Sequence, residues 1–381
     1  MTSTRTFALL ALALAACGDN ADPPSADGGP DSVDAAGDGT TATAFAVGTD
    51  FVAAGIASAI DIPALAVTQN AVDGVASTDP VVRHGDGRVY IVNRFGADNV
   101  TVLDARSLQL VAQISPGAGS NPPDVAADGD LLYVATLAGP GLVVLDLARP
   151  DEGVVDTIDL SRLDRTDGEP NCHSAVRVDR RLAVVCGILD EEYQPRARGR
   201  VAVIDLDSGR VRETVLLEHR RPFGFAMAVA AGPLSGDLLV PTVPKFLDPA
   251  ADGCVERVQL AADPPVSGGC LVDNQTLGGF AAGLTTGADG AVWMAVTTGF
   301  DPDDYGPVGY AAAWDPAAGA VQAPITGSEV RAMDVAACPG GALAVSDATL
   351  GVRVYGDSGA ELTEAPLDLG LPPVANGLVC Y

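Results

Sequence analysis

DPVVRHGDGRVYIVNRFGADNVTVLDARSLQLVAQISPG, residues 79–117, is the stretch that decides the fold of this chain. It contains four short apolar or alternating runs, DPVVRHGDG, RVYIVNR, NVTVLDARSL and LVAQISPG, separated by Gly, Asp, Asn or Pro. Short runs with period-two alternation and such residues between them predict β-strands joined by turns. Residues 79–117 are therefore expected to supply four strands of one repeating unit.

The same unit recurs along the chain. In the third strand of each unit, an apolar run ends in an aspartate before a turn, and this aspartate occurs at Asp61, Asp104, Asp146, Asp205, Asp315 and Asp357. The successive separations are 43, 42, 59, 110 and 42 residues, and we interpret the longest as two units with a degenerate member at CVERVQL. A period of about 40 to 55 residues with several strands per unit is typical of propeller blades, and the lack of a 3.6-residue pattern disfavours helical solenoids.

The segment RVYIVNRFGADNVTVLDARSLQLVAQISPG resembles the YVTN family of β-propeller repeats, with VYIVNR in the signature strand and NVTVLD in the next. LLYVATLAGPGLVVLDL, residues 131–147, repeats the likeness more loosely, and the signature drifts in the second half of the chain. The resemblance implies a propeller architecture and leaves the function open.

The number of blades follows from counting units. Residues 45–76 supply three strands, six units follow, and PPVANGLVCY at residues 372–381 supplies one more strand. One strand plus three completes a seventh blade, and closing the ring with strands from both termini removes a free pairing edge. We predict an all-β, seven-bladed propeller over residues 42–381.

The start of the chain resembles the export signal of a bacterial lipoprotein. Leu14, Ala15, Ala16 and Cys17 match the lipobox pattern, after Arg5 and an apolar run over residues 7–16. Ten residues rise only about 15 Å as a helix, too little for a hydrocarbon core of about 30 Å. The resemblance implies that residues 1–16 are cleaved and that Cys17 carries the lipid that holds the protein on a membrane. An ordinary cleaved signal with an accidental cysteine is the alternative.

Residues 17–41 follow this signal and have a different composition. They consist mostly of Gly, Ala, Pro, Ser, Thr and Asp, with six aspartates and no basic residue. Such a segment buries too little to offset its conformational entropy, so we predict a disordered acidic tether between the lipidated cysteine and the propeller. The aspartate spacing does not follow the ligand order of an EF-hand.

Six cysteines remain after Cys17, an even number that in an exported protein favours disulfides over metal or redox chemistry. The blade assignment suggests three pairs: Cys172 with Cys186, Cys254 with Cys270, and Cys338 with Cys380. The first pair falls on the first two strands of one blade, the second brackets a hairpin, and the third joins innermost strands of the last and the closing blade. Reduced structural cysteines are the alternative.

Charge and motifs exclude several functions. The net charge of −28 would repel phosphate backbones, so we expect no binding to nucleic acid. Lys245 is the sole lysine and has no context that suggests a Schiff base. There is no GxSxG elbow, Walker loop or zinc signature.

We expect the protein to be a monomer.

Three consecutive blades have long loops between their second and third strands: LDEEYQPRARGR (189–200), VPKFLDPAADG (243–253) and GFDPDDYGPVG (299–309). Long loops gathered on one side suggest a binding surface. Tyr193, Arg196 and Tyr305 are candidate contact residues, because aromatic and arginine side chains supply rigid contact area. Ordinary loop packing is the alternative.

Two further groups are candidate sites. His173 begins an innermost strand, and Arg331 and Asp334 occupy the comparable region of a later blade, so these three side chains are candidates for convergence across the channel. Polar channel residues that bind water are the alternative. The loop carboxylates Asp301, Asp303 and Asp304 are a candidate calcium site, because hard cations take clustered oxygens, and a solvated acidic loop is the alternative.

Histidine spacing argues against another kind of metal site. The chain has three histidines, and none forms an HxH or HxxxH pair. A site built from several histidines is therefore disfavoured.

The favoured function is a membrane-anchored lipoprotein of the bacterial cell envelope whose propeller binds a protein or glycan. The alternative is an exported propeller enzyme, either a metal-dependent lactonase-like or a quinoprotein-like one. A quinoprotein needs a tryptophan that stacks on its cofactor, and the chain has only Trp293 and Trp314. A rigid spacer in an envelope assembly is a third reading. No cofactor other than calcium is suggested.

Overall fold

The four runs of residues 79–117 form one antiparallel sheet in the computed structural model of the protein. The structure describes residues 42–245, 248–287, 290–303, 306–316, 318–328, 330–348 and 351–381. The sheet consists, in spatial order, of β4 (Pro80–Gly85), β5 (Arg88–Asn93), β6 (Asn99–Asp104) and β7 (Leu110–Ile114). The signal peptide, Cys17 and the tether predicted for residues 1–41 lie outside the described residues.

Side chains on the two faces of β5 pack into two different hydrophobic clusters. Val89 and Ile91 pack with Phe45, whereas Tyr90 packs with Val125 of the next sheet. Both faces of this strand are therefore buried between neighbouring sheets, which explains why it reads as a continuous apolar run. The core of the propeller lies between its blades.

Five more sheets follow in chain order. The second contains β8 (Asp124–Asp128), β9 (Leu131–Ala135), β10 (Gly141–Asp146) and β11 (Val154–Asp159). The third contains β12 (Cys172–Val178), β13 (Arg181–Cys186), β14 (Arg198–Asp205) and β15 (Arg210–Arg220). The fourth contains β16 (Met227–Ala228), β17 (Asp237–Pro241), β18 (Cys254–Gln259) and β19 (Val266–Asp273). The fifth contains β20 (Phe280–Thr286), β21 (Val292–Phe300), β22 (Pro307–Asp315) and β23 (Ala320–Val321). The sixth contains β24 (Ala332–Ala337), β25 (Leu343–Asp347) and β26 (Gly351–Tyr355).

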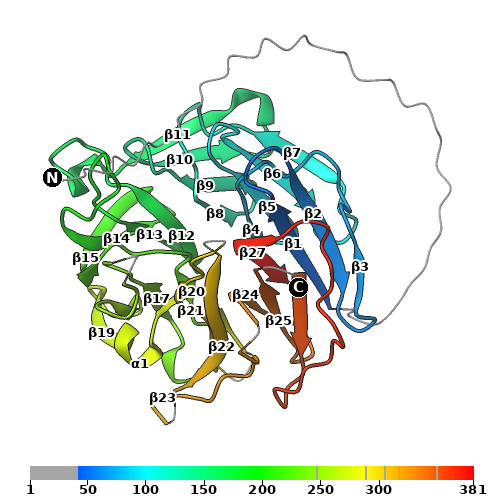
Figure 1. Cartoon of the computed structure of the whole chain (residues 1–381). Coiled ribbons are helices and arrows are strands. Elements are labelled where there is room, and N and C mark those ends of the chain that lie inside the picture. The colour runs from blue at the N-terminus through cyan, green and yellow to red at the C-terminus, as the bar shows by residue number, and fades with distance from the viewer. Residues whose placement is uncertain are drawn as a thin grey trace, which may run out of the picture. The chain divides into compact units, whose positions relative to one another are not determined.

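The seventh sheet closes the ring, as predicted. Its order is β27 (Pro373–Cys380), β1 (Thr43–Thr49), β2 (Gly55–Asp61) and β3 (Ala66–Thr68), so one C-terminal strand completes a sheet of three N-terminal strands. Ala44 pairs with Cys380 and Ala46 with Leu378. Figure 1 shows the sheets arranged around a central axis, with β4, β8, β12, β24 and β27 close to it. The prediction of an all-β, seven-bladed propeller is confirmed.

The recurring aspartate of the sequence repeat stabilises a turn. Oδ1 of Asp104 accepts hydrogen bonds of 2.8 Å from the backbone N–H and the hydroxyl of Ser107. Asp205 and Ser208 repeat this arrangement at 2.9 Å. An aspartate side chain that bonds its own backbone a few residues ahead favours a turn over continued strand, which is why the repeat was visible in the sequence.

The sixth sheet departs from the expected four strands. Among the residues described, it contains three strands, and the segment that follows β26 contacts it through two isolated bridges, Val352 with Leu367 and Tyr355 with Glu361. Pro366 lies beside the first bridge and has no N–H to donate to a strand ladder. The outer edge of this blade is therefore irregular.

Two of the three expected disulfides are formed. Cys172–Cys186 links the directly paired strands β12 and β13, and Cys338–Cys380 links the end of β24 to β27. The third expectation needs correction, because Cys254 and Cys270 are free thiols. In the register of β18 and β19, Cys254 lies opposite Asp273 and Cys270 lies opposite Glu256.

The helices are short. They are α1 (Asn274–Leu277) and the 3-10 turns η1 (Pro150–Glu152), η2 (Ser161–Leu163) and η3 (Gly232–Leu234). Within the described part of the chain, no helix has the length and apolar character that crossing a membrane requires.

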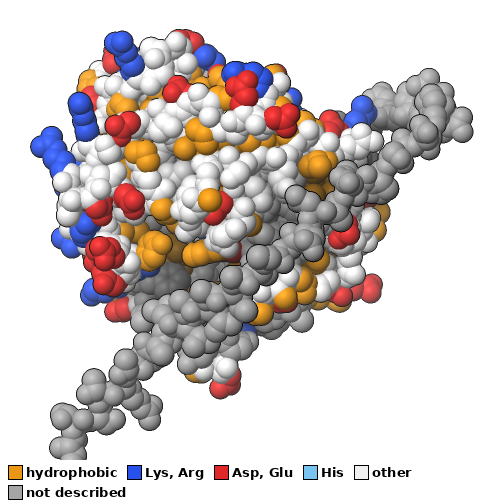
Figure 2. Space-filling view, turned by 90° about the horizontal axis from the view of Figure 1, so that it is seen from above, with side chains coloured by type: hydrophobic (Ala, Val, Ile, Leu, Met, Phe, Trp, Pro, Cys, Tyr) orange, Lys and Arg blue, Asp and Glu red, His pale blue; other side chains and the backbone are white. Residues whose placement is uncertain are grey.

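Charged side chains on the surface are extensively paired. Arg177 binds Asp86 at 3.2 Å and Asp128 at 2.7 Å, which joins the first turns of three consecutive blades. Arg180, which belongs to the same blade as Arg177, also binds Asp128. Figure 2 shows acidic and basic side chains interspersed on the face in view, with apolar side chains between them. Pairing of this kind moderates the repulsion within an acidic chain.

Candidate functional site

A pocket of about 280 Å³ opens at the end of the ring where the innermost strands begin. We call it the mouth pocket, and its walls come from the first four blades and the closing blade. Its lining includes Phe95, Asn121, His173, Tyr193, Phe223 and Asn376. The expected loop residue Tyr193 and the expected channel residue His173 thus lie in one site.

Left-handed backbone recurs at the rim of the mouth pocket. Asn121, Asn171 and Arg221 have φ angles of 45°, 51° and 50°, each shortly before the innermost strand of its blade. Non-glycine residues adopt this conformation uncommonly, and asparagine tolerates it best because its short side chain can bond locally. Strained backbone of this kind concentrates at functional sites, where surrounding structure holds it in place.

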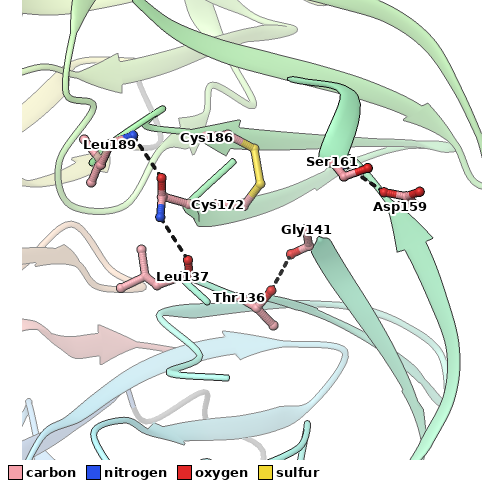
Figure 3. Close-up of a disulfide and its surroundings, with 9 residues drawn as sticks. Thr136, Leu137, Gly141, Asp159, Ser161, Cys172, Cys186 and Leu189 are labelled. Carbon is pink, nitrogen blue, oxygen red and sulfur yellow. Dashed lines mark hydrogen bonds between the residues drawn. A yellow bond between two sulfur atoms is a disulfide. The ribbon is translucent and has the colours of Figure 1, made fainter. Parts of the chain in front are cut away.

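Asn171 shows how that backbone is held. Its Nδ2 donates to the carbonyl oxygen of Leu137 at 3.1 Å, and its Oδ1 accepts from the backbone N–H of Leu189 at 2.9 Å. These two hydrogen bonds lie beside the Cys172–Cys186 disulfide (Figure 3). The loop that carries Tyr193 is therefore attached to a covalently braced strand pair.

The channel behind the pocket contains a buried ion pair that joins three innermost strands. Nε and Nη2 of Arg83 each donate to an Asp124 carboxylate oxygen at 2.6 Å, and the Asp124 side chain is fully buried. The Ser174 hydroxyl donates to the same carboxylate at 2.8 Å. The Arg83 guanidinium also lies 3.5 Å from the ring centroid of Phe225. Paired, hydrogen-bonded charges are the form in which ions persist in a protein interior.

His173 presents an uncharged imidazole to the mouth pocket. Burial lowers its pKa to about 4, against a smaller opposing effect of Asp124. Nδ1 is buried and has no hydrogen-bond partner among the described residues. A neutral imidazole offers one donor and one acceptor, so this side chain can exchange a hydrogen bond with a ligand.

Asp334 lies on β24 and is almost completely buried. It accepts hydrogen bonds from the backbone N–H groups of Val335 at 2.9 Å and Leu378 at 3.1 Å. Burial raises its pKa to about 7, although these backbone donors and the charge of Arg83 oppose the increase. A Cβ at Gly283 would overlap the Asp334 carboxylate, so the glycine makes room for it.

The other expected site residues have separate partners. Arg331 donates to Asp301 at 2.7 Å, and the Asp301 carboxylate also accepts from the backbone N–H of Asp303 at 2.8 Å. The structure therefore assigns Arg331 to a loop carboxylate, while His173 faces the mouth pocket and Asp334 contacts β27. Asp304 and Tyr305 lie outside the described residues.

Arg196, the remaining candidate, binds two carboxylates that precede its blade. Its Nη2 lies 2.6 Å from Asp164 and 2.5 Å from Asp167. These ion pairs tie the long loop of the third blade to the segment after η2. Arg196 therefore supports the loop that carries Tyr193.

Sequence reasoning missed most of the mouth pocket. Phe95, Phe223 and Asn376 line it from three blades, and nothing in their local sequence marks them. One signal was present: NPPD, NCHS and RPFG begin at Asn121, Asn171 and Arg221, which are spaced by 50 residues. That spacing identifies equivalent rim positions only after the blades have been assigned.

Comparisons with known proteins support the fold. No family model matches the chain, and no curated protein matches it. Among solved structures, the chain is similar to apo AztD from Citrobacter koseri, with 11% identity and a TM-score of 0.50 over 89% of this chain and 98% of that chain. It is also similar to hydrazine synthase of Kuenenia stuttgartiensis, with 16% identity and a TM-score of 0.54 over 77% of this chain and 88% of that chain. At such identities the likeness concerns the fold alone.

Proposed function

We propose that the chain is a lipid-anchored protein of the bacterial cell envelope whose YVTN-type propeller binds a protein or glycan partner at the mouth pocket. In this proposal residues 1–16 are a cleaved signal, residues 17–41 a lipidated tether and residues 42–381 the binding domain. The two disulfides support a place outside the cytoplasm, because such bonds persist in oxidising compartments.

The mouth pocket is the observation that carries the binding proposal. Its volume of about 280 Å³ suits a single sugar ring or a single side chain of a larger partner. Tyr193 is 49% exposed and Phe95 is 66% exposed at its rim. Exposed aromatic side chains around a partly apolar hollow are typical of recognition sites.

The position of the mouth pocket also suits an anchored receptor. Val81, near the start of β4, lines the pocket, whereas His84, near the end of β4, stacks on Tyr381. Tyr381 exchanges backbone hydrogen bonds with Thr43, the first residue of β1. The described part of the chain therefore begins at the end of the propeller opposite the pocket.

Two parallel assays test binding. The purified propeller-containing chain is applied to an array of bacterial envelope glycans, and a photoreactive amino acid at position 193 is cross-linked in envelope extracts. We expect a captured glycan or protein that is lost on Phe95→Ala and retained on Leu110→Ala, which removes an exposed apolar side chain from the outer strand β7. Equal capture by both variants would place the partner elsewhere. Conversion of the captured ligand into a product would favour an exported propeller enzyme instead.

The anchor has a test of its own. In a bacterial host, Cys17→Ser should move the protein from the membrane fraction to the soluble envelope fraction and abolish incorporation of labelled fatty acid. Cys270→Ser, which also removes a free thiol, should change neither. Fatty-acid labelling that persists in Cys17→Ser would contradict the lipoprotein assignment.

A further inference from the structure

A second group of polar side chains lies between the third and fourth blades, outside the mouth pocket. Nδ1 of His219, on β15, lies 2.9 Å from Oε1 of Glu256 and 3.7 Å from Sγ of Cys254, both on β18. These three atoms lie within 4.8 Å of one another. Imidazole nitrogen, thiolate sulfur and carboxylate oxygen are the donors that zinc takes in proteins.

Cys270 offers a fourth donor beside this group. It lies opposite Glu256 on the neighbouring strand β19, and its exposed thiol neighbours that of Cys254. Its sulfur is not one of the three atoms that lie within 4.8 Å of one another, so the Cys270 side chain has to turn toward them to complete a set of two sulfurs, one nitrogen and one oxygen.

The spacing of these donors fits a tetrahedral ion. Zinc bonds of about 2.0–2.3 Å place neighbouring ligand atoms about 3.3–3.8 Å apart. The two separations measured from His219 Nδ1, 2.9 Å and 3.7 Å, differ from that range by a few tenths of an ångström at most. His219, Cys254 and Glu256 therefore need only small side-chain movements to accept an ion, and Cys270 joins them by turning its exposed side chain inward.

Two of the ligands are already oriented by their neighbours. Glu256 accepts backbone N–H bonds of 2.7 Å from Glu218 and from His219, one on each carboxylate oxygen. Nε2 of His219 lies 3.6 Å from Oδ1 of Asp252. A carboxylate behind the second imidazole nitrogen fixes the ring and its tautomer in many zinc sites.

Burial and access also suit a bound ion. The Glu256 side chain is fully buried, and its ion-pair partner among the described residues is His219. Cys254 is buried as well, whereas Cys270 is exposed and His219 is 23% exposed. An ion can therefore enter from the Cys270 side and compensate a carboxylate that the protein keeps away from water.

We propose that His219, Cys254, Glu256 and Cys270 bind one zinc ion that joins the third blade to the fourth. On binding, the two thiols each lose a proton, and His219 coordinates through Nδ1 while Nε2–H faces Asp252. The two thiolates favour zinc over calcium or magnesium, which prefer oxygen ligands. The inference is independent of any partner at the mouth pocket.

The test uses the full chain with Cys17→Ser, so that no other free thiol contributes. The protein, with Cys254 and Cys270 reduced and its two disulfides intact, is stripped with a chelator, loaded with Zn²⁺ or Co²⁺ and passed through a desalting column. We expect one ion per chain by elemental analysis, and an intense thiolate-to-cobalt absorption band in the near ultraviolet. Cys270→Ser and His219→Gln should weaken or abolish both signals, and His84→Gln, which changes a histidine outside the cluster, should leave them unchanged.

A second measurement needs no ligand variant. Zn²⁺ should protect both thiols of the otherwise unaltered chain from alkylation, whereas Ca²⁺ should not. Three results would overturn the proposal: no retained ion, a cobalt band of undiminished intensity in Cys270→Ser, or a Cys254–Cys270 disulfide as the form isolated from the cell envelope.

Discussion

Asp334 shows how a single residue couples this fold to pH. Its pKa of about 7 in the folded protein lies well above the value of about 3.9 for an unfolded chain. Between these values the folded state binds a proton that the unfolded state does not. This contribution to stability is therefore complete below about pH 4 and is lost as the pH rises to about 7.

Asp334→Asn should remove that pH dependence, because the amide stays uncharged. We expect the variant to gain about 4 kcal/mol on the wild type between pH 4 and pH 8. Urea unfolding of both proteins across this range measures the difference. A difference that stays constant with pH would show that Asp334 does not carry the proton.

A second prediction at the residue scale concerns the ion pair in the channel. Asp124→Ala leaves the partly buried guanidinium of Arg83 without its carboxylate partner, so we expect a loss of about 3 kcal/mol. Asp130→Ala removes a carboxylate from an exposed pair with Arg88 and should cost less than about 1 kcal/mol. Denaturant unfolding compares the two, and equal losses would mean that the channel pair is not structural.

At the scale of elements, the turn after the third strand of the first blade depends on Asp104. Asp104→Ala removes the acceptor for Ser107 and should lower the melting temperature, whereas Asp104→Asn keeps an oxygen in place and should retain most of the stability. Scanning calorimetry distinguishes the two variants. Identical melting of both variants would show that the hydrogen bond from Ser107 does not stabilise the turn.

The same turns explain how far the sequence could be interpreted. The aspartate and the apolar runs act locally, so strands such as β5 and β6 and the number of blades could be predicted. The irregular edge after β26 could not be predicted. It arises because the segment around Pro366 contacts β26 only through isolated bridges and does not form a regular fourth strand. The free thiols of Cys254 and Cys270 were missed because the sequence places the two cysteines on adjacent strands but does not give the register that sets Cys254 opposite Asp273 and Cys270 opposite Glu256. The mouth pocket was missed because five blades meet there.

At the scale of the whole molecule, the ring is held closed by two independent devices. Hydrogen bonds between β27 and β1 join the two ends of the chain within one sheet. The Cys338–Cys380 disulfide then fixes β27 to the sixth blade, across a sequence separation of 42 residues. The Cys172–Cys186 disulfide, with a separation of 14, lies within one blade and joins strands that already pair.

These two bridges should therefore differ in their effect. Replacing Cys338 and Cys380 by alanine frees the longer loop of the unfolded chain and should cost about 4 kcal/mol, against about 3 kcal/mol for Cys172 and Cys186. Amide hydrogen exchange distinguishes the two bridges more clearly than the free energy of unfolding does. Only the variant that lacks Cys338 and Cys380 should show faster exchange in β1 and β27, because the ring opens between these strands and the sixth blade. If exchange in β1 and β27 is not accelerated in the variant that lacks Cys338 and Cys380, strand pairing alone closes the propeller.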